Sequence, residues 1–149
     1  LLPTQIEDEN DSLAHLFSSP ERYAAALRIS VAEVEEKQRL HEQSFKDLHQ
    51  ILQNPDLSGK EKHHITCRHR YEHGRHPFVC RKCWSYDPIC ICHLAPNPKM
   101  KLPSKVKGVR LWTSHYEWGS VSNTGSVLPL IMEDTELLMK GLEHHDSLF

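Results

Sequence analysis

Four of the five cysteines in this 149-residue chain fall in one short stretch, as the pairs Cys80-x-x-Cys83 and Cys90-x-Cys92. Two thiolate pairs brought together across a short loop present four soft, negatively charged ligands to one centre, which is what tetrahedral zinc requires. The Asp87-Pro88 dipeptide between the pairs is a turn signal that can fold the second pair back on the first. We therefore predict a four-cysteine zinc element over residues 80–98.

The residues around the cysteines suit this chemistry. A Cys-x-x-Cys sequence makes a tight knuckle, and the cations Arg81 and Lys82 inside it are expected to lower the pKa of the thiols by favouring thiolate. Cys90 and Cys92 are expected to share one face of an extended segment, because side chains alternate along a strand.

The cysteines allow three other interpretations, and each meets an objection. A thioredoxin-like redox Cys-x-x-Cys needs a preceding strand and a following helix, which the sequence around Cys80 does not supply. Disulfides need an oxidising compartment, and no signal peptide is visible. A catalytic zinc needs an open coordination position, which four thiolates do not leave. We expect structural zinc in an intracellular protein, cytoplasmic or nuclear; organellar targeting stays open because the sequence begins at Leu1.

Charge is distributed unevenly, although the formal total is only −2. Residues 1–53 contain five basic and ten acidic residues, residues 54–110 twelve basic and four acidic, and residues 111–149 one basic and six acidic. An interior basic block is the pattern expected of a surface that binds a phosphate backbone; a solvated face without a partner is the alternative. The residues assigned to RNA binding are Arg68, Arg70, Arg75, Arg81, Lys82, Lys99, Lys101, Lys105 and Lys107.

The first third of the chain is expected to be helical after an acidic, disordered segment over residues 1–17. Ser18-Ser19-Pro20-Glu21 has the pattern of a helix start, the helical region covers residues 18–55, and Ser30-x-x-Glu33 indicates a break into two helices. We expect the apolar stripe of this region to pack on the chain's own domain; a coiled coil or a partner-binding helix is the alternative. The stripe comprises Leu27, Val31, Val34, Gln38, His41, Phe45, Leu48 and Leu52.

Residues 56–79 are predicted to be a basic, histidine-rich connector. Cys67 and several imidazoles in it are capable of binding metal, but their spacings form no closed four-ligand pattern, and the later cysteines already provide one. We therefore assign the segment to RNA contact or to a solvated linker, and Cys67 to a free thiol.

The last third predicts a partial α/β domain over residues 99–149. Residues 106–113 alternate as a strand, a loop covers 114–124, an apolar helix lies near 125–132, and a second strand covers 135–139. This order is a βαβ unit with parallel strands, in which ligands bind at the carboxyl ends of the strands. Asn123-Thr124-Gly125 at the helix start offers amides and small polar side chains to a carboxylate or ribose; it is also an ordinary cap and turn.

The ordered combination of these motifs resembles the DTW-domain family of tRNA-uridine aminocarboxypropyltransferases. The resemblance covers about residues 76–141, about half of the chain. The Asp-Thr-Trp tripeptide that names the family is absent, the spacing of His115-x-Glu117 is one residue short, and Ser126 replaces a common basic residue. The motifs that carry it are Pro77, Cys80-x-x-Cys83, Pro88, Cys90-Ile91-Cys92, Leu94, His115-x-Glu117 and Asn123-Thr124-Gly125.

The predicted fold class is α/β: the long N-terminal helical region and the zinc element come first. The resemblance implies that the first βαβ unit of a SPOUT-like parallel sheet follows them, as in the first half of such an enzyme. It also implies an S-adenosylmethionine-dependent transferase of alkyl groups, which moves the 3-amino-3-carboxypropyl group to N3 of a uridine in tRNA. The expected cofactors are S-adenosylmethionine and structural Zn²⁺, and the expected partner is tRNA.

The site residues follow from this resemblance. Asn123, Thr124 and Gly125 are expected to contact S-adenosylmethionine. The favoured base of the family, the Asp of Asp-Thr-Trp, is missing, so His115 and Glu117 are the remaining polar candidates for catalysis.

No apolar run approaches the ~18 residues that span a bilayer, so we expect no membrane partner. The alternative function is a zinc-stabilised RNA-binding or interaction module without catalysis.

Overall fold

The computed structural model describes residues 19–148 of the chain. The predicted disordered segment, residues 1–17, lies outside this range. The chain divides into two compact units after Leu40, inside a helix. Among residues 19–148, no helix combines the length and the apolar character that a membrane span needs.

The first unit contains helix α2 (Pro20–Leu27) and the beginning of α3 (Val31–Leu52). Ser19 caps α2 by accepting a hydrogen bond from the Arg22 amide at 3.3 Å. Arg28, in the left-handed conformation, ends α2, and a reciprocal capping box between Ser30 and Glu33 begins α3. The predicted break into two helices is confirmed.

The second unit contains the end of α3 and helix α4 (Gly59–His73), which occupies most of the segment predicted to be a connector. That prediction missed the helix because α4 has no apolar stripe, so hydrophobic periodicity gives no signal. The available signal was the capping box, in which the Ser58 amide donates to Glu61 Oε2 at 2.8 Å and the Glu61 amide donates to Ser58 Oγ at 3.2 Å.

The C-terminal part of α3 packs on α4. The Phe45 ring lies 4.7 Å from the His69 ring, and His69 Nε2 donates to the Ser44 carbonyl at 3.0 Å. Leu48, one turn further on, is buried. For this part of the predicted stripe, packing on the chain's own domain is confirmed.

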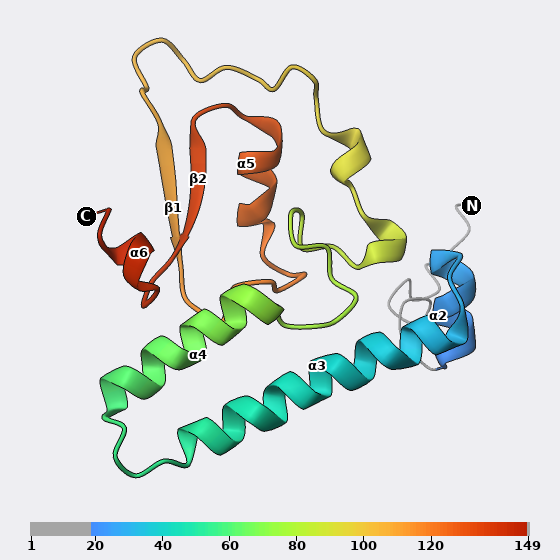
Figure 1. Cartoon of the computed structure of the whole chain (residues 1–149). Helices are drawn as coiled ribbons and strands as arrows, with labels where there is room; N and C mark the ends of the chain where they lie inside the picture. Colours follow the sequence, from blue (N-terminus) through green and yellow to red (C-terminus); the bar gives the residue numbers. More distant parts are fainter. Residues whose placement is uncertain (1–18, 149) are drawn as a thin grey trace, which may run out of the picture. The chain divides into compact units, whose positions relative to one another are not determined.

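Strands β1 (Val109–Thr113) and β2 (Thr135–Met139) form a two-stranded parallel sheet, with Val109 opposite Thr135 and Thr113 opposite Met139. The short helices η3 (Thr124–Ser126) and α5 (Val127–Ile131) connect the strands, and α6 (Glu143–Asp146) follows β2. Figure 1 shows the strands side by side, with α5 next to β2. The mixed α/β class and the parallel pair are confirmed.

The cysteine element between α4 and β1 has little regular structure. A single antiparallel bridge joins Val79 to Tyr86, and the short 3₁₀ helices η1 (Asp87–Ile89) and η2 (Cys92–Leu94) follow. The predicted extended segment at Cys90 and Cys92 is wrong, because Ile91 has φ −95° and ψ 4°, which turns the chain between them. The predicted turn at Asp87-Pro88 is present as η1.

A small core joins α4 to β2 and to the loop after β1. Its buried members are Cys67, Met139 and Leu142, and Tyr71 and Trp118 pack against them. Cys67 and Met139 are fully buried. This core fixes α4, which carries few apolar residues of its own, against the sheet.

Candidate metal centre

The four cysteine sulfurs converge on one point. All four Sγ atoms lie within 4.8 Å of one another. Cys80 Sγ and Cys92 Sγ are 3.6 Å apart, and Cys83 Sγ and Cys90 Sγ are 3.7 Å apart. A disulfide would need ~2.05 Å, whereas the edge of a tetrahedron with Zn–S bonds of ~2.3 Å is ~3.8 Å. The four cysteines are therefore free thiols positioned to hold a metal ion, compatible with structural zinc.

Backbone hydrogen bonds close the first cysteine pair into a knuckle. The Trp84 amide donates to the Cys80 carbonyl, and the Cys80 amide donates to the Ser85 carbonyl, both at 2.9 Å. Trp84 has φ +58°, which is uncommon for a bulky residue. Its indole is buried and meets the Trp118 ring edge-on at 5.2 Å, so packing of this side chain holds the knuckle closed.

The thiols differ in how readily they ionise. Burial raises the pKa of Cys83, but hydrogen bonds from the backbone of Ser85 and Ile91 outweigh it and lower the pKa to about 6. Burial, together with the neighbouring sulfurs, raises the pKa of Cys90 and Cys92. Cys83 thus ionises more readily at neutral pH than Cys90 and Cys92, and a bound cation would favour the thiolate form of those two. The causes that lower the pKa of Cys83 are hydrogen bonds, whereas the sequence predicted this effect from the cations Arg81 and Lys82.

Arg81 and Ser126 dock the cysteine element onto the rest of the unit. The Arg81 guanidinium donates to the carbonyls of Glu72, at 2.8 Å, and of Tyr71, both in the last turn of α4. A cation at this end of a helix also complements the helix dipole. Ser126 Oγ, which is fully buried, donates to the Cys83 carbonyl at 2.9 Å. The four-cysteine cluster is thereby joined to α4 and to η3.

The predicted RNA-binding residues fall into two groups. Some bind protein carbonyls: besides Arg81, Arg75 Nη1 donates to Tyr116 at 2.6 Å, Lys99 Nζ to Pro129 at 2.7 Å, and Arg70 Nη1 to Gly74 at 3.4 Å. The others are exposed to solvent, namely Arg68, Lys82, Lys101, Lys105 and Lys107.

The predicted cofactor residues start the short helix after the β1 loop. Asn123 Oδ1 accepts a hydrogen bond from the Gly125 amide at 2.8 Å, so this side chain caps η3, while Thr124 is exposed. A Cβ on Gly125 would lie 3.0 Å from Asn123 Oδ1, so glycine keeps the turn tight. Of the two catalytic candidates, Glu117 is exposed and His115 is buried.

The structure also brings together three residues that the sequence did not combine. Ligand atoms of His63, Cys67 and His115 lie within 4.8 Å of one another. His63 and Cys67 are one turn apart on α4, a spacing that places them on one face once the helix is recognised. His115 comes from the loop after β1, and only tertiary structure brings it there. Burial, with the charge of His63 and Arg70, lowers the pKa of His115.

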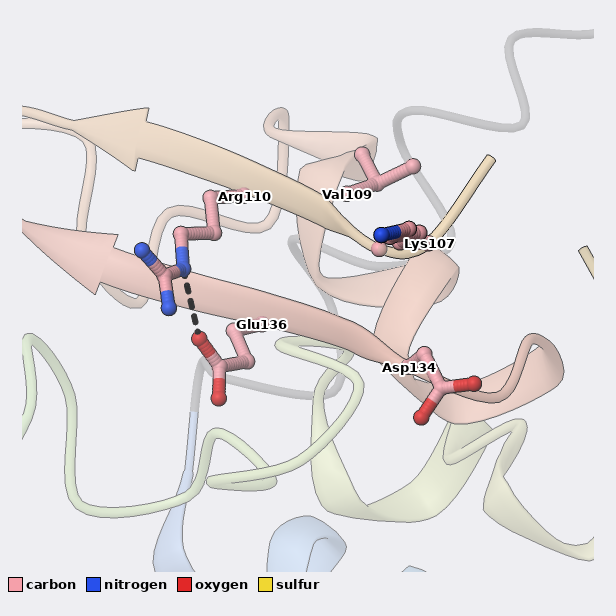
Figure 2. A pocket seen from close by; sticks show the side chains of 6 residues that line it. Lys107, Val109, Arg110, Asp134 and Glu136 are labelled. Carbon is pink, nitrogen blue, oxygen red and sulfur yellow. Dashed lines mark hydrogen bonds and ion pairs between the residues drawn. The ribbon is translucent and has the colours of Figure 1, made fainter. Parts of the chain in front are cut away.

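A cavity of about 510 Å³ lies at the beginning of the two strands, lined by Lys107, Gly108, Val109, Arg110, Asp134 and Glu136. Figure 2 shows the ion pair that crosses the strands there, with 3.1 Å between Arg110 Nε and Glu136 Oε2. Both side chains are more than half exposed. The pair is therefore expected to stabilise the sheet by at most ~1 kcal/mol. This cavity is at the opposite end of the strands from the loop 114–125.

Comparisons of the chain with protein-family models, with curated proteins and with solved structures found no match.

Proposed function

We propose that the chain is an S-adenosylmethionine-dependent transferase of the DTW type, which moves the 3-amino-3-carboxypropyl group to N3 of a uridine in tRNA. The observation that carries this proposal is the hydrogen bond from Ser126 Oγ to the Cys83 carbonyl, 2.9 Å long and fully buried. It joins the four-cysteine centre directly to the Asn123-Thr124-Gly125 turn, so the two most specific motifs of the resemblance form one structural unit.

The position of this unit supports a ligand site. The loop 114–123 leaves the carboxyl end of β1 and ends at η3, and in parallel sheets ligands are bound at that end of the strands. Asn123 fixes the turn, and the exposed Thr124 hydroxyl is the polar group available to a ribose or carboxylate.

The proposed reaction makes few chemical demands on the protein. Uridine N3 bonds to the γ-carbon of the donor, the carbon–sulfur bond breaks, 5′-methylthioadenosine leaves, and the N3 proton passes to a base. The protein must hold the two reactants in line and accept that proton. Glu117 is the accessible candidate for this role, because its carboxylate is exposed in the same loop, whereas His115 is buried.

The exposed cations fit a polyanionic substrate. Lys101, Lys105 and Lys107 lie on the segment that leads into β1, and Lys82 lies in the cysteine knuckle. Each lysine that neutralises a phosphate adds to affinity and to its salt dependence. We expect tRNA binding that weakens steeply with salt.

Two labelled forms of the donor test the reaction. The zinc-loaded chain is incubated with a tRNA transcript and S-adenosylmethionine labelled either in the carboxyl carbon or in the methyl group. Transfer of the first label but not of the second is expected, since only the aminocarboxypropyl group moves. Transfer of the methyl label would indicate a methyltransferase, and transfer of neither label would count against the proposal.

Matched variants test the residues. Glu117→Gln is expected to reduce transfer by about 10²-fold or more, as for loss of a general base, while S-adenosylmethionine binding measured by calorimetry persists. Ser122→Ala, an exposed change in the same loop, is the control and should leave both unchanged. Equal transfer rates for Glu117→Gln and the control would exclude Glu117 as the base.

A second candidate is a zinc-stabilised RNA-binding module without catalysis. The observation that favours it is that Asn123 Oδ1 is already occupied by the Gly125 amide, so it contributes to the turn and not to a ligand. Salt-dependent tRNA binding, with no calorimetric signal for S-adenosylmethionine and no transfer of either label, would support this candidate over the first.

A further inference from the structure

We propose that His63, Cys67 and His115 form a second transition-metal site, of the zinc type with three protein ligands and one exchangeable position. Residues 19–148 thus contain two metal sites of different kinds: the closed four-cysteine centre and an open site between α4 and the carboxyl end of β1. The second site is independent of the proposed transferase function.

The distances fit a metal of this size. Cys67 Sγ and His63 Nε2 are 3.6 Å apart. A tetrahedral ion with a Zn–S bond of ~2.3 Å and a Zn–N bond of ~2.0–2.1 Å would hold these atoms ~3.6 Å apart. The His115 nitrogen lies within 4.8 Å of both atoms, and its ring centroid is 5.2 Å from that of His63, so a small ring movement completes the set.

Gly141 keeps this space open. A Cβ at this position would lie 2.5 Å from His63 Nε2 and 2.8 Å from Cys67 Sγ, much closer than side chains tolerate. Gly141 also has φ +89°, which other residues rarely adopt. Glycine at position 141 therefore lets the chain turn beside the cluster and leaves room for the ligand atoms.

The donor set determines the class of metal. One thiolate and two imidazoles are borderline-soft ligands that suit zinc and its neighbours in the periodic table, and not magnesium or calcium. The Asp146 carboxylate accepts the Gly141 amide at 3.2 Å, and its negative charge beside this turn is compatible with a bound cation.

Burial orients the site. Cys67 is fully buried and His115 nearly so, whereas His63 is exposed. The three protein ligands therefore cover the inner side of the metal, and the fourth position faces solvent on the side of His63. This arrangement also counts against Cys67 as a nucleophile activated by His63, because no substrate atom can reach a thiol with 0% exposure.

Cobalt binding to the full chain tests the proposal, since tetrahedral Co²⁺ absorbs visible light in a pattern set by its thiolate ligands. Wild type is expected to bind about two Co²⁺ ions, one with the spectrum of four thiolates and one with that of a single thiolate. His63→Gln is the decisive variant, because the position is exposed and glutamine keeps a polar side chain there while removing the imidazole. Loss of an outer-shell partner alone weakens metal binding 10–100-fold. We therefore expect His63→Gln to weaken the second site by ~100-fold or more and to leave the first unchanged.

The matched control is His64→Gln, the neighbouring histidine on α4 that lies outside the cluster. It should retain both metal ions, and Cys67→Ser should remove the single-thiolate band alone. Azide is the probe of the open position: it should shift the single-thiolate bands of wild type and not those of the four-thiolate site. One Co²⁺ per chain in wild type, or equal binding by His63→Gln and His64→Gln, would overturn the second site. Bands that azide leaves unchanged would overturn the exchangeable position.

Discussion

Single side chains, more than extended surfaces, hold the metal-binding element in place. Ser126 is 1% exposed, and its hydroxyl donates a hydrogen bond to the Cys83 carbonyl at 2.9 Å. If its donor is removed, a buried carbonyl has given up its hydrogen bonds to water without gaining a replacement, and the fold is destabilised. The serine that departs from the DTW pattern, where a basic residue is common, thus has a structural role in this chain.

Ser126→Ala is therefore expected to lower the free energy of unfolding by about 1–2 kcal/mol. Urea denaturation of the zinc-loaded chain at neutral pH measures this change. Ser104→Ala, an exposed position in the segment before β1, is the control and should change stability by less than ~0.5 kcal/mol. Equal effects of the two substitutions would contradict the role of the buried hydrogen bond.

His145 is expected to make stability depend on pH. Its Nδ1 accepts the Met139 amide at 2.9 Å, and burial, with the charge of His144, lowers its pKa, although Asp146 and Glu136 act in the opposite direction. The unfolded chain then takes up this proton at a higher pH than the folded chain. The stabilisation that neutral His145 provides is fully present above the ordinary histidine pKa of ~6.5, and it is lost as the pH falls below that value.

Urea midpoints at pH 7.5 and 6.0, with the zinc content of each sample checked, measure this effect. His145→Asn keeps an acceptor near the position of Nδ1 but does not titrate. Below pH 6.5, the free energy of unfolding of wild type is expected to fall by up to ~1.4 kcal/mol more per pH unit than that of the variant. The same pH dependence in both proteins would rule out His145 as the cause.

At the scale of elements, α4 is the helix on which the second unit depends. It is polar on all sides, yet three sets of tertiary contacts hold it. The carbonyls of its last turn bind Arg81, and Cys67 and Tyr71 on one face pack in the core. His69 on another face contacts Phe45. A helix with this composition gains little from propensity and periodicity, so its ends and its tertiary contacts must stabilise it.

Ser58→Ala removes the N-cap of α4 and is expected to lower the free energy of unfolding by ~1 kcal/mol. Lys60→Ala, an exposed change in the first turn, should be close to neutral because alanine favours helix. Far-ultraviolet circular dichroism followed through urea denaturation measures both. No difference between the two variants would show that the capping box contributes nothing.

At the scale of the whole molecule, the four-cysteine centre links elements from three parts of the second unit. Arg81 binds the end of α4, Ser126 binds the knuckle to η3, and Trp84 contacts Trp118 in the loop after β1. The sheet itself has two strands, which seldom suffice for stability. The metal centre is thus expected to contribute to the stability of the entire unit.

Removal of zinc by a chelator should therefore destabilise the unit and not the knuckle alone. A metal present at ~1,000 times its dissociation constant contributes ~4 kcal/mol, or ~10 °C in Tm for a chain of this size. Calorimetry of the holo and chelated chains measures the shift, and the emission of the buried Trp84 should move to longer wavelength. Trp84→Phe identifies that signal, and an unchanged Tm after verified metal loss would refute the expectation.

The sequence by itself determined the features that depend on near neighbours. The caps at Ser19 and Ser30, the strand over residues 135–139, the turn at Asp87-Pro88 and the clustering of the four cysteines all follow from local chemistry and spacing. The parallel pairing also followed, because a strand, a helix and a strand in that order leave few other arrangements.

Tertiary structure alone decided the rest. Helix α4 lacks the apolar periodicity by which the sequence would predict it, since Cys67 is its one buried residue and Tyr71 is only partly buried beside it. Arg81 binds helix carbonyls because α4 ends beside it, which no local pattern contains. His63, Cys67 and His115 converge for the same reason: two lie one turn apart on a helix, and the third arrives from a distant loop when the core closes. Contacts between residues far apart in sequence are properties of the folded chain.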